Sequence, residues 1–100
     1  MGRYFITDPA AADLAQLWQE YVERGGTEAS ADRLTDKLLS SFQNLADFPD
    51  IGTPRDYLTA NLLAFPHDDY MIFYQKRSYG VDIARVLYGA MDLKEFFTQH

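Results

Sequence analysis

Apolar residues recur at helical spacing near the start of the chain. They lie on one helical face and are Leu14, Leu17, Trp18, Tyr21 and Val22. Asp8 can cap free backbone N–H groups before this stretch, and Pro9 suits a first helical position. Gly25 and Gly26 follow it, and glycine adopts left-handed backbone conformations at low cost. The pattern predicts an amphipathic helix that ends before Gly25.

A second helical pattern follows within a few residues. Thr27 can cap it. Its apolar positions are Ala31, Leu34, Leu38, Leu39, Phe42 and Leu45. The segment 47–52 contains a proline and a glycine and closes the pattern. Because the connection between the two helices is so short, we expect them to pack antiparallel as a hairpin.

The remaining apolar runs are rich in aromatic and β-branched residues, which is typical of strands. The predicted strands are residues 3–7, 57–65, 70–75 and 81–88. Turn-like sequences at 66–69 and 76–80 make the last three strands an antiparallel meander. The third run is apolar on both faces, so we expect it to be central. The first strand must pair into the same sheet, because a lone strand is not stable.

The helices are segregated from the run of strands, which predicts an α+β fold. We expect one domain over residues 1–100. Its elements are an N-terminal strand, an antiparallel two-helix hairpin, a three-stranded antiparallel meander completing one sheet, and a short C-terminal helix. That helix would begin at Asp92.

Composition narrows the class of protein. Hydrophobic residues make up 47% of the chain and aromatic residues 15%, which is enough for a core and argues against disorder. The absence of cysteine excludes disulfides and thiolate metal sites, and it fits the cytoplasm, where we place the protein. The sequence contains no window of about 18 apolar residues, so we expect no membrane-spanning helix.

The charge is acidic and unevenly distributed. The net charge is −6, and residues 1–50 hold 4 basic and 9 acidic side chains. Proteins that bind nucleic acid through its phosphates present clustered Lys and Arg. We therefore expect no direct binding to nucleic acid.

Three parts of the chain resemble toxins of the RelE/ParE superfamily of type II toxin–antitoxin systems. They are YFITDPAAADL at 4–14, LADFPDIGTPR at 45–55, and the late pair 70–74 and 81–92. The resemblance implies a toxin that a cognate antitoxin neutralises. RelE-like members cleave mRNA on the ribosome with basic and tyrosine residues on the sheet, and ParE-like members act on DNA gyrase.

The sequence departs from the RelE pattern in its basic residues. Ala90 follows Gly89 where a basic residue is frequent in the family, and Leu62, Leu63 and Ala64 offer no arginine. RNA cleavage needs groups that activate the 2′-hydroxyl and stabilise charge on the phosphate. We therefore favour a ParE-like toxin that inhibits gyrase by binding rather than by catalysis. The alternatives are a RelE-like mRNA endonuclease and a non-toxic domain that still binds the antitoxin.

Three residues are candidates for contact with a target or for chemistry. Arg85 lies in an apolar strand and either pairs with a carboxylate such as Asp82 or Asp92, or contacts carboxylates of a partner. Arg55 is either a solvated loop residue or shares a groove with Arg85. Tyr88 either packs on the sheet or, in an RNA-cleaving enzyme with these two arginines, shuttles a proton.

The helical hairpin offers a second candidate surface. Trp18 and Tyr21 are either core residues or, if left uncovered, part of an antitoxin-binding surface. The family resemblance implies that this antitoxin is a ribbon-helix-helix DNA-binding protein with a disordered tail.

Other polar residues give weaker indications. His67 next to Asp68 and Asp69 is more typical of a polar turn than of a metal site, which needs three or four converging ligands. The serines show no accompanying base in the sequence. We expect neither a metal nor a cofactor.

Overall fold

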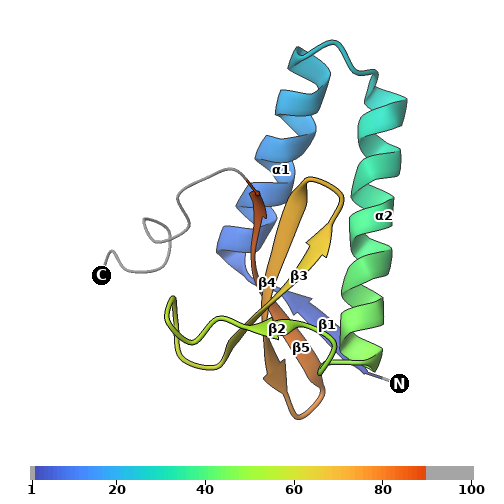
Figure 1. The fold of residues 1–100 in the computed structure, drawn as a ribbon. Coiled ribbons are helices and arrows are strands. Elements are labelled where there is room, and N and C mark those ends of the chain that lie inside the picture. Colours follow the sequence, from blue (N-terminus) through green and yellow to red (C-terminus); the bar gives the residue numbers. More distant parts are fainter. Residues whose placement is uncertain (1, 90–100) are drawn as a thin grey trace.

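The computed structural model describes residues 2–89. The elements in chain order are β1 (Arg3–Ile6), α1 (Asp8–Glu23), α2 (Glu28–Asp47), β2 (Thr53–Pro54), β3 (Leu62–His67), β4 (Tyr70–Arg77) and β5 (Gly80–Tyr88). The strands form one sheet in the order β1-β5-β4-β3-β2. Figure 1 shows the two helices as a hairpin whose connection projects beyond the sheet. The α+β fold, the antiparallel hairpin and the meander are confirmed, and the predicted C-terminal helix lies outside the described residues.

The helix ends follow from local side chains, with one difference from the prediction. Thr7, rather than Asp8, is the N-cap of α1, and its Oγ1 accepts a hydrogen bond from the Ala10 N–H at 3.4 Å. Asp8 is instead the first helical residue, where its charge favours the positive end of the helix dipole. Thr27 caps α2 as predicted, and Gly25 has the left-handed φ of 99° that ends α1.

The sheet differs from the prediction at its far edge. β3 starts at Leu62 and continues through Pro66 and His67, so residues 57–61 are loop and the β3–β4 turn is short. The loop is held by a hydrogen bond from the Asn61 N–H to Asp56 at 3.0 Å, and Asn61 adopts a left-handed φ of 63°. The two-residue strand β2 was not predicted, because two residues carry no periodicity.

Apolar side chains form one buried cluster on each face of the sheet. The cluster on the helix side is made by buried residues of both helices and of β4 and β5, including Leu17, Leu38, Phe42, Leu45, Ile72, Val81 and Ile83. The opposite face buries Leu58, Leu62, Ala64, Phe73 and Leu87. β4 is therefore covered on both faces and lies in the middle of the sheet, as predicted.

β1 joins the sheet by running parallel to the first half of β5. It pairs with residues 80–83 and ends there. Between Ile83 and Arg85 the pairing with β4 shifts, which leaves Ala84 as an extra residue in a β-bulge. The Thr7 hydroxyl donates to the Ile83 carbonyl at 2.8 Å and fixes the chain where it leaves the sheet. The second half of β5 consequently has α1 rather than β1 beside it on this side, while β4 pairs with it on the other side.

Candidate protein-binding groove

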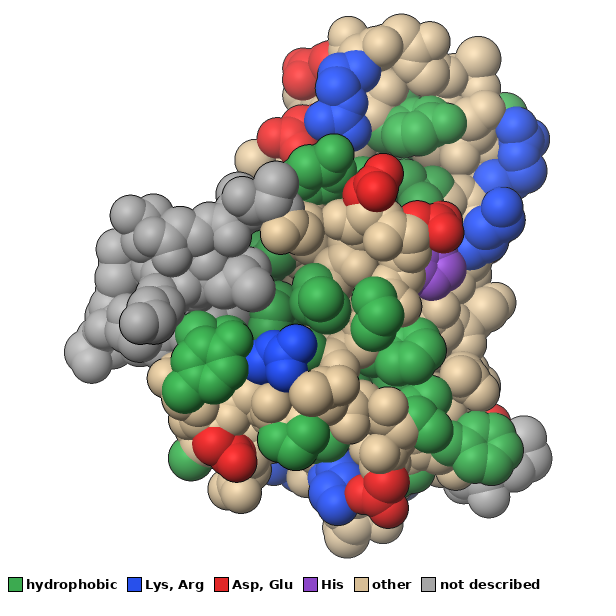
Figure 2. Space-filling view, in the orientation of Figure 1, with side chains coloured by type: hydrophobic (Ala, Val, Ile, Leu, Met, Phe, Trp, Pro, Cys, Tyr) green, Lys and Arg blue, Asp and Glu red, His purple; other side chains and the backbone are tan. Residues whose placement is uncertain are grey.

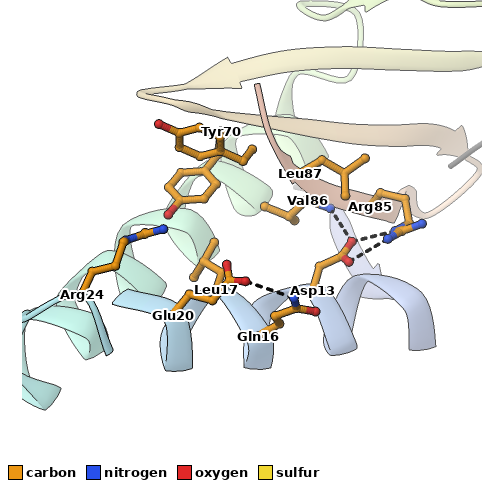
Figure 3. A pocket seen from close by; sticks show the side chains of 10 residues that line it. Asp13, Gln16, Leu17, Glu20, Arg24, Tyr70, Arg85, Val86 and Leu87 are labelled. Carbon is orange, nitrogen blue, oxygen red and sulfur yellow. Dashed lines mark hydrogen bonds and ion pairs between the residues drawn. The ribbon is translucent and has the colours of Figure 1, made fainter. Parts of the chain in front are cut away.

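A groove of about 380 Å³ lies between α1 and the second half of β5. Figure 3 shows side chains of both elements pointing into it. Its lining residues are Asp13, Gln16, Leu17, Glu20, Arg24, Tyr70, Arg85, Val86, Leu87 and Tyr88. The α1 members recur every three or four residues, so one face of the helix forms a continuous wall.

The groove has an apolar base and an aromatic side. Leu17, Val86 and Leu87 are each at most 5% exposed. Tyr70 and Tyr88 stack edge to face, with ring centroids 5.7 Å apart, and Tyr88 stays 46% exposed. A buried apolar base beside an exposed tyrosine is typical of protein-binding surfaces.

Arg85 and Asp13 form a bidentate ion pair at one end of the groove. The Arg85 Nε and Nη2 atoms donate to the two carboxylate oxygens at 2.7 and 2.8 Å. The same carboxylate accepts the Val86 backbone N–H at 2.9 Å. The hydrogen bond to Asp13 raises the pKa of Arg85, against the smaller opposing effect of burial. The pair therefore ties α1 to the strand just after the bulge.

The structure brings together only part of the predicted site. Arg85 and Tyr88 both line the groove, whereas Arg55 does not, since β4 and β3 lie between β5 and the β2 edge that Arg55 follows. The sequence-based partners of Arg85 were Asp82 and Asp92. Asp82 instead binds Arg77 at 2.8 Å, and Asp92 lies outside the described residues.

The aromatic residues of the hairpin lie outside the groove. Trp18 is half-buried, and its Nε1 donates to Asp32 of α2 at 2.9 Å. Tyr21 is half-buried as well, and its ring lies against Gly26 in the interhelical turn. Trp18 therefore joins the two helices, and Tyr21 packs on the turn that connects them. The α1 residues that face the groove are the polar flank of the apolar stripe, and this 3–4 spacing is the feature that would have located them.

One serine does have a histidine beside it, although the sequence shows no base accompanying any serine. Ser41 on α2 and Nδ1 of His67 lie 2.7 Å apart, joining residues 26 positions apart in the chain. Nε2 of His67 is buried without a hydrogen bond, and it lies 3.8 Å from the Asp68 carboxylate. Within residues 2–89, no group of three or more His, Asp or Glu side chains is placed to hold a metal ion.

Basic side chains of the late strands are engaged by carboxylates. Lys76 binds Asp50 at 2.7 Å, and Arg77 binds Asp82. The contact with Asp50 raises the pKa of Lys76. Figure 2 shows Lys and Arg side chains scattered over the visible face, with acidic side chains among them and apolar side chains over the sheet. These ion pairs offset positive charge on the late strands, where phosphate binding would require clustered and uncompensated Lys and Arg.

Comparisons with known proteins identify the family. The model of the ParE toxin of the type II toxin–antitoxin system parDE matches residues 4–93. The chain belongs to the ParE toxin family. It is 30% identical to Toxin ParE3 of Caulobacter vibrioides, over 93% of this chain and 92% of that protein. It is 29% identical to Toxin ParE1 of the same organism, over 94% and 96%.

A solved structure shares the ParE fold. The chain superimposes on a chain of the chromosomal ParDE toxin–antitoxin system from P. aeruginosa with a TM-score of 0.73. The match covers 88% of this chain and 96% of that chain at 18% identity. The ParE architecture is thus kept although most side chains differ. Neither described helix of this ParE-family chain is long and apolar enough to cross a membrane.

Proposed function

We propose that this ParE-family toxin acts in the cytoplasm by binding and inhibiting DNA gyrase, and that a cognate antitoxin neutralises it by binding the groove between α1 and β5. The observation that carries the proposal is the match to the ParE toxin family over residues 4–93. The acidic net charge of −6 supports a protein target over nucleic acid.

The groove supports an antitoxin that offers an amphipathic segment. Apolar side chains of that segment would lie over the apolar base of the groove and cover the exposed ring of Tyr88, and polar ones would meet Glu20 and Arg24 on the α1 wall. We expect the segment to be the disordered tail of a ribbon-helix-helix protein that folds on binding. In this proposal the exposed Tyr88 is a main contact, since tyrosines are enriched among residues that dominate binding energy.

The geometry favours binding over RNA cleavage. Of the two arginines of the alternative RNA-cleaving site, Arg85 shares the groove with Tyr88, and Asp13 holds its guanidinium in a bidentate pair. An arginine that stabilises a phosphate would have to leave this carboxylate. Arg55 lies outside the groove. The three residues of the alternative RNA-cleaving site are therefore not assembled.

A supercoiling assay tests the target. Purified toxin added to gyrase and relaxed plasmid should inhibit supercoiling, and antitoxin added first should prevent the inhibition. Uninhibited supercoiling at concentrations well above micromolar would contradict gyrase as the target. A parallel incubation with ribosome-bound mRNA tests the alternative, since cut mRNA with uninhibited gyrase would replace this proposal with a RelE-like activity.

Expression of the chain without antitoxin separates a toxin from a harmless remnant. We expect growth arrest and relief of that arrest when the antitoxin is expressed too. Normal growth with the protein present at detectable levels would contradict toxicity.

A matched pair of variants tests the groove. Tyr88→Ala should weaken antitoxin binding about tenfold or more, measured by isothermal titration calorimetry. Tyr57→Ala is the control, because Tyr57 is 67% exposed and does not line the groove. Equal affinities of the two variants would place the antitoxin elsewhere.

A further inference from the structure

β1 is an edge strand, and some of its backbone N–H and C=O groups point away from the sheet. The Arg3 N–H donates to the carbonyl of Tyr79, just before β5, at 2.7 Å, and the Thr7 N–H donates to the carbonyl of Ile83 in β5 at 3.2 Å. Since backbone groups alternate along a strand, those of Tyr4 and Ile6 point away from β5. No residue in the described range bonds to them there. These two residues form an unpaired edge, which can accept another strand.

The two ends of this open stretch are closed. Before it, the Gly2 N–H donates to Asp47 at 3.1 Å and the Gly2 carbonyl accepts from Gln43 at 2.9 Å. After it, Asp8 begins α1. An added strand can therefore pair with four backbone groups, the N–H and C=O of Tyr4 and of Ile6.

The side chains beside this edge are exposed and aromatic. Phe5 is 58% exposed and Tyr79 is 38% exposed. With Arg3 and Tyr4 they line a shallow hollow of about 360 Å³. The opposite edge of the sheet, β2, is only two residues long and contains Pro54, which has no N–H to donate. The β1 edge has no such protection.

We propose that β1 pairs antiparallel with β1 of a second copy of this chain, about a two-fold axis through the two Phe5 residues. In this register Tyr4 of each copy lies opposite Ile6 of the other. Each of these two pairs exchanges two backbone hydrogen bonds, so all four open groups of both copies are satisfied. The two Phe5 side chains meet on the face away from the helices and cover each other's exposed rings.

Charge agrees with this arrangement. Arg3 lies opposite Thr7 of the second copy, next to the Asp8 carboxylate there, and the contact occurs twice by symmetry. The groove does not include β1, so this interface is independent of the proposed antitoxin site.

Disulfide trapping tests the interface, because the chain has no cysteine of its own. Phe5→Cys places two thiols on the axis in a non-hydrogen-bonded pair, where Cα atoms are about 4.5 Å apart and a disulfide can form. We expect the purified variant to form covalent dimers at least about tenfold faster than Phe48→Cys, since pairing raises the local thiol concentration. Phe48 is a matched control that is 60% exposed and lies outside β1.

A second cysteine variant tests the register. Arg3→Cys faces Thr7 in the proposed pairing, so it should form dimers more slowly than Phe5→Cys. Faster trapping of Arg3→Cys would overturn the register. Trapping of Phe5→Cys no faster than Phe48→Cys would overturn the interface.

Sedimentation velocity of the unmodified chain provides a measurement without trapping. The interface is small, so we expect a concentration-dependent monomer–dimer equilibrium with a dissociation constant that is micromolar or weaker. Phe5→Asp should shift it toward monomer, and Phe48→Asp should not. The proposal would be overturned if the chain stayed monomeric at all concentrations up to about 1 mM. It would also be overturned if the two variants had the same monomer–dimer equilibrium. Either result is expected if this edge takes a strand from a different protein.

Discussion

The ion pair between Asp13 and Arg85 leads to the sharpest stability prediction. Replacing Asp13 with alanine removes three hydrogen bonds together, two from Arg85 and one from the Val86 N–H. The Asp13 and Arg85 side chains are only 12% and 21% exposed, so water replaces these bonds poorly. The change should therefore loosen the attachment of α1 to the second half of β5.

The magnitude follows from the groups that lose their partner. An unsatisfied backbone N–H costs about 1 kcal/mol or more, and the Val86 N–H would be one. The Arg85 guanidinium loses a bidentate carboxylate, which we estimate at about 1–2 kcal/mol because the group retains some access to water. Asp13→Ala should lower the free energy of unfolding by about 2–3 kcal/mol. Asp13→Asn keeps one carbonyl acceptor and should lose roughly half as much.

Urea unfolding followed by fluorescence measures this loss. Trp18 is the single tryptophan, and it joins α1 to α2 through Asp32, so its emission reports on the hairpin. Asp50→Ala is the control, because it removes an ion pair with Lys76 in which both side chains are more than half exposed. We expect no measurable loss from it, as is common for surface pairs.

Two results would refute the reasoning. One is a loss for Asp13→Ala no greater than the loss for Asp50→Ala. The other is a double-mutant cycle with Arg85→Ala that gives a coupling energy near zero, where contact predicts about 1–2 kcal/mol.

Two further predictions concern Tyr74 and Gly80. Burial raises the pKa of Tyr74 above its ordinary value of 10.0, so folding favours the neutral hydroxyl. This contribution of Tyr74 to the free energy of unfolding is complete below pH 10.0 and is lost as the pH rises toward the folded-state pKa. Above pH 10.0 the melting temperature of the unmodified protein should therefore fall more steeply with pH than that of Tyr74→Phe. Parallel pH profiles of the two proteins would contradict this. Gly80 has φ 145°, and an added Cβ would overlap the Arg3 carbonyl, whereas Gly25 has φ 99° with open space around it. Gly25→Ala should cost about 1 kcal/mol and Gly80→Ala clearly more, and equal urea midpoints would count against the close approach of β1.

Local features of the fold could be predicted because they depend on neighbours in the chain. The caps and glycines bound the two helices, and the composition of 70–75 identified the central strand. Thr7 and Asp8 compete for one cap position, so the choice between them depended on where the chain leaves β1. The loop at 57–61 was mistaken for strand because Leu58 is buried by tertiary packing rather than by a sheet.

The candidate site could be predicted only in part. Arg85 was a candidate because it is a charged residue in an otherwise apolar strand, and Tyr88 because it follows three residues later; the structure places both in the groove. Asp13 was missed as the partner of Arg85 because 72 positions separate them, and no periodicity links a helix to a strand at that distance. The bulge at Ala84 shifts the pairing of β5, and the sequence pattern gives no sign of it.

The sequence by itself determined the element order, the helical hairpin, the central strand and the ParE resemblance, because each rests on spacing or residue type within a short window. The tertiary structure alone decided that β1 runs parallel to β5 and stops halfway along it. That arrangement leaves two surfaces, the groove beside α1 and the open edge of β1. The groove depends on where β1 ends beside β5, and the open edge depends on which backbone groups of β1 stay unpaired. Both follow from pairing between segments far apart in the sequence, which no short window of the sequence determines.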